Sequence, residues 1–153
     1  MAKITQISLK GIDLIRQFEG LRLKPYLCQA GVPTIGIGTT VYPDGKKVSL
    51  KDKEITEVQA IEFLKHDLTF FCSQVDSFTT DSVSQFQFDA LVSFAYNLGA
   101  TALKGSTLLK KVNANPNDPT IHNEFLKWVM ADGKRSQGLL NRRIAESEIY
   151  FTK

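Results

Sequence analysis

One long stretch with helical periodicity, residues 53–78, most constrains the fold of this chain. Its apolar side chains recur every three or four positions, at Val58, Ile61, Leu64, Leu68, Phe71 and Val75. This spacing predicts a single amphipathic helix, with Cys72 on or near its apolar side. The helix follows a segment with strand character and precedes a run of further helices. It can therefore join two lobes of one protein.

The part of the chain before this helix changes character twice. Ser8 is placed to cap a first helix, whose helical spacing ends near Phe18-Glu19-Gly20. Residues 21–40 are rich in β-branched and aromatic residues but are interrupted by prolines and glycines. They predict a small antiparallel sheet of two or three strands. The sequence Tyr42-Pro43-Asp44-Gly45 then predicts a turn.

The rest of the chain shows helical spacing. We expect a helix that ends at Gly99, a short one capped at Ser106-Thr107, and one that starts at Asp118-Pro119 and is broken at Gly133. In the third of these, apolar residues share one face: Phe125, Trp128 and Val129. A last helix is expected over 137–151.

Because strands and helices are segregated along the chain, the predicted fold class is α+β and mostly helical. We expect one domain over residues 1–153. Residues 12–60 would form a sheet lobe and residues 60–153 a helical lobe, with the first helix packed on the helical lobe. The 153 residues are 42% hydrophobic and 23% charged, which is typical of a globular protein with a real core.

Charge and composition exclude several classes of function. The net charge of +3 lacks the dense basic clusters of a nucleic-acid binder, and the basic residues around 134–143 are expected to form a solvated face. Two cysteines and two separated histidines, His66 and His122, suggest neither a disulfide framework nor a metal site. Residues 1–7 contain no apolar run of signal length, and the uncharged stretch 25–43 holds prolines and glycines. We expect synthesis in the cytoplasm and no stable membrane insertion.

Glu19 is the first candidate for catalysis, because it lies where the first helix ends and the sheet begins. The negative end of the helix dipole and partial burial both disfavour its ionised form. A glutamic acid kept protonated can donate its proton to a leaving glycosidic oxygen. Eight residues separate Glu19 from Cys28, and five more separate Cys28 from Thr34. A hairpin of this length can bring these side chains together, and Gly36 and Gly38 would let a sugar approach the backbone closely.

This spacing resembles the phage-type lysozymes, the T4-like muramidase family, whose signature is Glu, eight residues, Asp or Cys, five residues, Thr. The strand Thr34-Ile35-Gly36-Ile37-Gly38 is also similar to the family's. The resemblance continues through three further segments, Gln87–Phe94, Asn97–Gly99 and Ser106–Leu109, and ends at Gly138–Arg143 and Glu146. It covers nearly the whole chain in order.

The resemblance implies a two-lobed lysozyme fold and hydrolysis of the β-1,4 bond between N-acetylmuramic acid and N-acetylglucosamine in peptidoglycan. It implies Glu19 as general acid, with Cys28 and Thr34 opposite. Arg142 would face Glu19 and favour its ionised form, although Arg143 lies within one residue of alignment error. The cleft residues that meet the glycan would be Thr40, Tyr96, Asn97 and Thr107. No cofactor or metal is implied. The enzyme would act as a monomer in the periplasm after a separate holin-type pore opens the membrane.

Cys28 departs from the many relatives that carry Asp at this position. A thiol with a pKa of about 8.5 is mostly neutral at pH 7, and an ionised Glu19 nearby would raise that pKa. Cys28 could orient a water together with Thr34, or attack as a minor thiolate fraction. Two other functions remain open from the residues: a non-catalytic peptidoglycan-binding or structural phage protein of the same fold, and a thiol enzyme that pairs Cys28 with His66 or His122.

Overall fold

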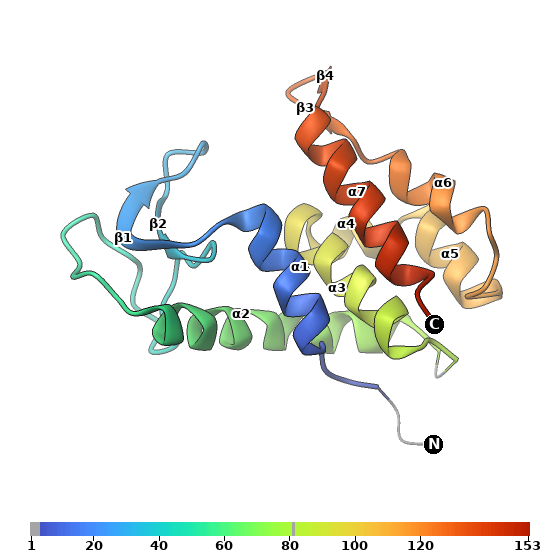
Figure 1. Ribbon diagram of the computed structural model, residues 1–153, viewed down its shortest axis with the longest axis horizontal. Helices are drawn as coiled ribbons and strands as arrows, with labels where there is room; N and C mark the ends of the chain where they lie inside the picture. Colours follow the sequence, from blue (N-terminus) through green and yellow to red (C-terminus); the bar gives the residue numbers. More distant parts are fainter. Residues whose placement is uncertain (1–3, 81) are drawn as a thin grey trace. The chain divides into compact units, whose positions relative to one another are not determined.

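The computed structural model describes residues 4–80 and 82–153, so residues 1–3, part of the segment searched for an export signal, lie outside the described residues. The chain divides into two compact units. We call Ile15–Phe70 the sheet unit, and the described residues of Met1–Leu14 and Phe71–Lys153 the helical unit. Helices dominate and the strands pair antiparallel, which confirms the predicted α+β class (Figure 1).

The first helix, α1 (Leu9–Glu19), has the predicted bounds. The Ser8 hydroxyl accepts a long hydrogen bond from the Gly11 amide at 3.5 Å, and the Ser8 carbonyl accepts one from Ile12 at 3.0 Å. At the other end, the amide of Gly20 donates to the carbonyl of Arg16 at 2.9 Å. Glu19 is therefore the last residue of the helix, directly before the first strand.

The sheet unit contains the predicted hairpin, built from β1 (Arg22–Leu27) and β2 (Pro33–Gly36). Arg22 pairs with Gly36 and Tyr26 pairs with Thr34, so β1 carries more residues between these pairs than β2 does. Pro25 lies in this irregular part. A proline is tolerated there, because it cannot donate a backbone hydrogen bond to the neighbouring strand. The predicted turn is confirmed, since the amide of Gly45 donates to the carbonyl of Tyr42 at 2.9 Å.

The expectation that Gly36 would let a sugar approach the backbone was wrong. The side of Gly36 that lacks a Cβ faces the helix that contains Ala60. Its φ is +68°, and a Cβ added there would lie 3.3 Å from the Cβ of Ala60. Gly36 is also buried. The absence of a side chain lets β2 approach the second helix closely, so this glycine serves packing within the sheet unit.

The long helix, α2, spans Glu57–Phe78 and begins four residues after the predicted start. The amide of Gln59 donates to the Thr56 hydroxyl at 3.1 Å, and the Gln59 side chain accepts from the Thr56 amide at 2.9 Å. This reciprocal capping box sets the start of the helix. The prediction that Val58 belongs to the apolar face was wrong, because Val58 is 69% exposed in the first turn. The buried face comprises Ala60, Leu64, Leu68, Cys72 and Val75.

The core of the helical unit forms around α3 (Gln85–Leu98), which packs against α7 (Gln137–Tyr150) (Figure 1). Every residue of α3 from Gln87 to Ala95 is buried, so this helix is covered on all sides. The rings of Phe125 and Trp128 meet the ring of Phe94 edge-on. Two short helices follow α3: α4 (Ala100–Lys104), which was not predicted, and α5 (Thr107–Ala114), which has the predicted cap at Ser106.

The segment between α5 and α7 differs from the prediction. Helix α6 (Ile121–Leu126) starts at Ile121 and not at Asp118-Pro119. The reason is that the Asp118 carboxylate accepts from the amide and the hydroxyl of Thr120, at 2.9 and 2.7 Å, and so forms a local turn. The helix also ends before Trp128 and Val129.

A small hairpin, not predicted, occupies the position where Gly133 was expected to break a helix. Its strands are β3 (Met130–Ala131) and β4 (Lys134–Arg135). Both turn residues have positive φ, +51° at Asp132 and +76° at Gly133. This is the pattern of a tight hairpin with an Asp-Gly turn.

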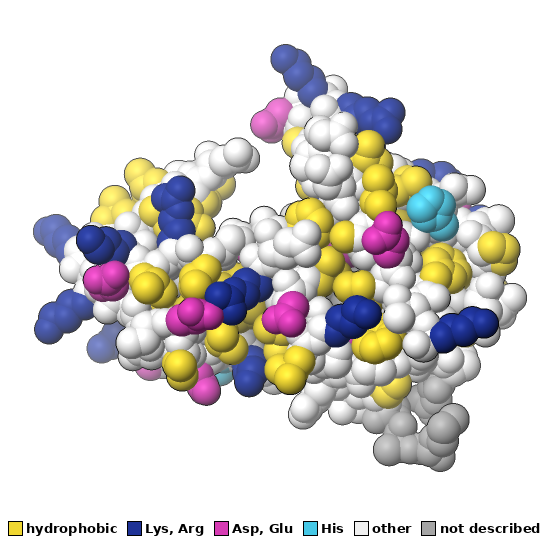
Figure 2. Space-filling model, viewed as in Figure 1, with side chains coloured by type: hydrophobic (Ala, Val, Ile, Leu, Met, Phe, Trp, Pro, Cys, Tyr) yellow, Lys and Arg dark blue, Asp and Glu magenta, His cyan; other side chains and the backbone are white. Residues whose placement is uncertain are grey.

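The surface in Figure 2 shows Lys and Arg side chains spread among polar and hydrophobic ones. His66 and His122 are both exposed on helices, as predicted. Over residues 4–80 and 82–153, no cluster of His, Cys, Asp and Glu has the makings of a metal site. Within the same ranges, no helix has both the length and the apolar character needed to cross a membrane.

Candidate active site

The predicted site residues belong to both units. The sheet unit holds the three catalytic candidates and the first glycan-binding candidate: Glu19, Cys28, Thr34 and Thr40. The helical unit holds the other candidates: Tyr96, Asn97, Thr107 and Arg142. Glu19 is partly buried at the end of α1. The predicted site residues thus form two groups, one in each unit.

Cys28 follows β1 directly and starts the tight turn of the hairpin. Its amide donates to the carbonyl of Val32 at 3.1 Å, and the Gly31 amide donates to its carbonyl at 2.9 Å. This folds the amides of Val32 and Ala30 towards the sulfur. Hydrogen bonds from these two amides are the main causes that lower the pKa of the Cys28 thiol; burial opposes them, and the Thr34 hydroxyl adds a smaller lowering effect. The expectation of a raised pKa is corrected, because the donors of the turn favour the thiolate.

Thr34 lies in β2 and is almost fully buried, with 3% of its surface exposed. Its hydroxyl donates to the carbonyl of Val32 at 2.8 Å and lies close enough to the Cys28 sulfur to help lower the pKa of that thiol when its O–H turns to it. The structure therefore brings two of the three predicted catalytic side chains close together. Both are positioned by the same turn.

Tyr26 is a neighbour of this group that the sequence reasoning did not single out. It pairs with Thr34 across the hairpin, and the guanidinium of Arg22 lies 4.5 Å from its ring centroid. Burial raises the pKa of Tyr26, Arg22 opposes this, and the negative charges of Glu19 and Cys28 raise it further. Tyr26 therefore lies within electrostatic reach of both catalytic candidates. Strand alternation could have identified it, since it comes two residues before Cys28.

Thr40 is exposed at the end of the sheet segment, and its carbonyl accepts from the Val48 amide at 2.9 Å. Its neighbour Thr39 is fully buried and donates its hydroxyl to Asp67 of α2 at 2.9 Å. Burial raises the pKa of Asp67, although this hydrogen bond opposes the effect. The Thr39–Asp67 contact anchors the segment, and Thr40 is thereby presented at the surface.

In the helical unit, three of the candidates lie near the ends of helices. Tyr96 is partly buried, and its ring meets that of Phe71 edge-on at 5.4 Å. Asn97 is partly exposed, and its side-chain oxygen accepts a hydrogen bond from Arg143. Thr107 is exposed at the first position of α5.

Arg142 is 3% exposed and lies in α7, so the expected solvated face around 134–143 needs correction. Lys134 and Arg135 of the hairpin are exposed, whereas Arg142 and Arg143 are buried. The Nε of Arg142 lies 3.3 Å from the carboxylate of Glu146. A buried carboxylate one helical turn away thus explains why two adjacent arginines lie in the core.

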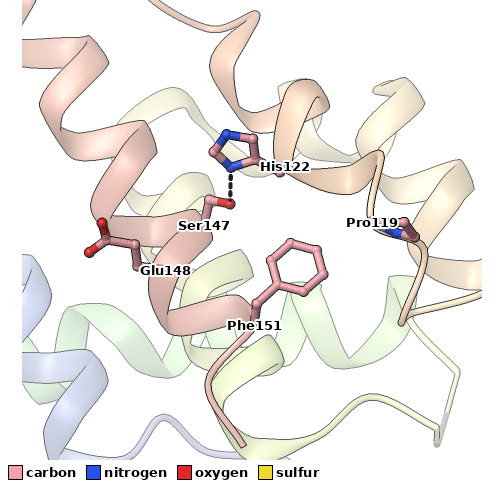
Figure 3. A pocket seen from close by; sticks show the side chains of 5 residues that line it. All are labelled: Pro119, His122, Ser147, Glu148 and Phe151. Carbon is pink, nitrogen blue, oxygen red and sulfur yellow. Dashed lines mark hydrogen bonds between the residues drawn. The ribbon is translucent and has the colours of Figure 1, made fainter.

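The helical unit also has a hollow of about 290 Å³ that none of the predicted residues lines, shown in Figure 3. At its edge, Nδ1 of His122 and the hydroxyl of Ser147 are 2.7 Å apart. Ser147 is only 2% exposed, and the hollow is also lined by Pro119, Glu148 and Phe151. Nδ1 of His122 is therefore engaged by a residue of its own unit. Cys28 and Cys72 are both free thiols.

Comparison with known proteins identifies the family. The phage lysozyme family matches residues 16–146. An endolysin of Bacillus phage B103 is 44% identical over 146 residues, 95% of this chain and 54% of that protein, so this chain spans about half the length of that relative. An endolysin of Salmonella phage P22 is 37% identical over 147 residues, 96% of this chain and 99% of that protein.

A solved structure agrees with these matches. The endolysin from Escherichia coli O157:H7 phage FAHEc1 has a TM-score of 0.87 and 41% identity to this chain, covering 95% of this chain and 93% of that one. The mostly helical fold with its small antiparallel sheet is thus the fold of solved phage lysozymes. The family match spans Glu19, Cys28 and Thr34 and most of both units, and the chain belongs to the phage lysozyme family.

Proposed function

We propose that this protein is an endolysin, a muramidase that hydrolyses the β-1,4 bond between N-acetylmuramic acid and N-acetylglucosamine in peptidoglycan. The observation that carries the proposal is the family match over residues 16–146, within which Glu19, Cys28 and Thr34 occupy the signature positions. The relatives named endolysins support the same activity. They also weigh against the non-catalytic alternative.

Glu19 is the general acid in this proposal and protonates the glycosidic oxygen as the bond breaks. Cys28 accepts a hydrogen bond from the attacking water, and its thiolate is stabilised by the amides of Ala30 and Val32. The Thr34 hydroxyl, which is held by the Val32 carbonyl, lies beside the sulfur and also favours the thiolate. A carboxylate at the position of Cys28 would serve the same purpose with a full negative charge.

Binding of the glycan is assigned to exposed and partly exposed polar groups in both units: Thr40, Tyr96, Asn97 and Thr107. Hydroxyl and amide groups suit the hydroxyl and acetamido groups of the sugars, because each can donate or accept hydrogen bonds. Arg142 is the proposed basic partner of Glu19. Within the helical unit, its guanidinium is oriented by Glu146 and by the Ser93 carbonyl at 3.2 Å.

The decisive experiment replaces Glu19 by Gln, which keeps the size of the side chain and removes its proton. We expect a loss of about 10²- to 10⁴-fold in the rate of turbidity loss on permeabilised Gram-negative cells. Glu62→Gln is the matched control, because Glu62 is an exposed glutamate on α2 in the same unit. Full activity of Glu19→Gln would remove Glu19 from the mechanism.

Product analysis distinguishes the proposed reaction from its closest rival. Muropeptides with reducing muramic acid are the products of hydrolysis, whereas anhydro ends would identify a lytic transglycosylase. Cys28→Asp should keep or raise the yield of reducing ends. A thiol nucleophile would instead lose its activity in that variant.

We also propose that the protein acts as a monomer on the wall in the periplasm. Because peptidoglycan lies outside the cytoplasmic membrane, a protein made in the cytoplasm would need a separate holin-type pore to reach it. Expression alone should then leave cells intact, and added permeabilisation should cause lysis. Size-exclusion chromatography tests the monomer.

A further inference from the structure

The buried carboxylate of Glu146 contacts both adjacent arginines of α7, and only its contact with Arg142 enters the proposed chemistry. We propose that Glu146 is a positioning residue for glycan binding, which holds Arg143, and through it the side-chain amide of Asn97, in one orientation. The same carboxylate holds Arg142. This inference rests on the proposed function, because Asn97 is one of the proposed glycan-binding residues.

The contacts of Glu146 use both of its oxygens. One oxygen accepts from the Ser93 hydroxyl at 2.6 Å and from Nε of Arg142 at 3.3 Å. The other lies 3.0 Å from Nε of Arg143, close enough for an ion pair although the two groups are not aligned for a hydrogen bond. Glu146 and Arg143 are both 0% exposed. Neither charge is compensated by bulk water.

Arg143, held by Glu146, in turn fixes the partly exposed side chain of Asn97. Its guanidinium lies 5.2 Å from the ring centroid of Phe94 and donates a hydrogen bond to the side-chain oxygen of Asn97. Because the oxygen of Asn97 is held on that side, the amide nitrogen turns to the other side, with two N–H donors. Asn97 is partly exposed. The orientation therefore suits a ligand that presents an oxygen acceptor, such as the acetamido carbonyl or a hydroxyl of a sugar.

Stability alone does not explain such an arrangement. Burial raises the pKa of Glu146, and the two guanidinium groups only partly oppose that effect. A buried charge network is often no more stable than apolar residues of the same volume, so it is weak support for a purely structural role. The network instead fixes the orientation of side chains, because a planar guanidinium binds its partners in a defined geometry.

A double-mutant cycle tests the coupling. The variants are Glu146→Gln, Asn97→Ala and the two combined, with kcat and KM measured on soluble peptidoglycan fragments at a temperature where circular dichroism shows each variant folded. We expect each single variant to raise KM by about tenfold and the double variant to raise KM by about tenfold as well, while a change in kcat in Glu146→Gln reports its separate contact with Arg142. The effects of independent roles would multiply, and a double variant with a KM about a hundredfold higher would overturn the proposal.

Glu124→Gln is the matched control. Glu124 is 5% exposed, belongs to the same unit and forms ion pairs with Lys111 and Lys127, but it does not contact Asn97 or Arg142 among the interactions of the described residues. It should leave KM unchanged. If Glu146→Gln does not fold, Ser93→Ala takes its place in the cycle, because it removes one donor to the same carboxylate. An unchanged KM in the folded variant would contradict the proposal.

A second readout does not depend on activity. The side-chain amide of Asn97 should give a displaced ¹⁵N–¹H NMR signal in Glu146→Gln and an unchanged signal in Glu124→Gln. If the wild-type protein lacks muramidase activity but this shift is present, the proposed function fails and the positioning of Asn97 stands. If activity is present and the signal does not move, the positioning role fails alone.

Discussion

The sheet unit and the helical unit hold their functional side chains in different ways. In the sheet unit, Cys28 and Thr34 are positioned by the turn that connects them, with donors from Ala30 and Val32. In the helical unit, Asn97 is positioned by Arg143, which lies 46 residues further along the chain. The first arrangement is local and partly exposed, and the second depends on two packed helices. The proposed catalytic pair Cys28 and Thr34 thus depends on a turn, while the orientation of the proposed binding group Asn97 relies on a buried core.

The largest effect should come from comparing one ion pair in each unit. Glu146→Ala leaves two buried arginines without their carboxylate and should lower the free energy of unfolding by about 3–5 kcal/mol. Glu57→Ala removes the partner of Arg16 in the sheet unit, where Glu57 is exposed and Arg16 is partly exposed, and should cost at most about 1 kcal/mol. Urea denaturation of both variants measures the difference. An equal loss of unfolding free energy in the two variants would show that burial does not make the ion pair of the helical unit more important for stability than that of the sheet unit.

Glycines with positive φ provide a second contrast. Gly36→Ala adds strain and a contact 3.3 Å from Ala60, so it should cost about 2–4 kcal/mol. Gly133→Ala, in the exposed hairpin, has the same backbone strain but no described atom within 4 Å of the new Cβ. It should cost about 1–2 kcal/mol. Urea denaturation is again the measurement, and a Gly133 variant as unstable as the Gly36 variant would show that strain alone decides.

The two units also differ in the expected reactivity of their cysteines, Cys28 in the sheet unit and Cys72 in the helical unit. Turn amides lower the pKa of Cys28, whereas burial raises the pKa of Cys72. Cys28 should therefore be alkylated by iodoacetamide at least about tenfold faster at neutral pH, because the thiolate is the reactive form. Because its pKa is lowered, Cys28 should also keep reacting as the pH falls below the ordinary range of thiols. Mass spectrometry of the native protein follows each site, and Cys72→Ser isolates the Cys28 rate; modification of Cys72 first would contradict the assignment.

The ends of the helices were predicted unevenly from the sequence. Helix ends set by a nearby hydroxyl, such as those at Ser8 and Ser106, could be placed from the sequence because their donors lie within three or four residues. The start of α2 was missed, although the capping pair Thr56 and Gln59 is visible in the sequence. The exposure of Val58 could not be inferred from periodicity, because a position in the first helical turn need not face the core.

The candidate site, like the helix ends, was predicted only in part. The spacing of Glu19, Cys28 and Thr34 identified the hairpin, and the structure places the last two in contact. Tyr26 could have been found from strand alternation. The direction of the Cys28 pKa shift could not, because it depends on where two backbone amides of the folded turn point.

By itself, the sequence determined the α+β class, the long helix, the hairpin and the residues of the family signature, because each depends on neighbours a few positions apart. Only the tertiary structure decided that Gly36 packs on Ala60 and that Arg143 and Glu146 share the core. These outcomes depend on segments distant in sequence that exclude water together, and the energy of a charge changes most when water is removed. The local sequence pattern therefore identifies the proposed catalytic residues, and packing decides which buried polar groups orient the proposed binding residues.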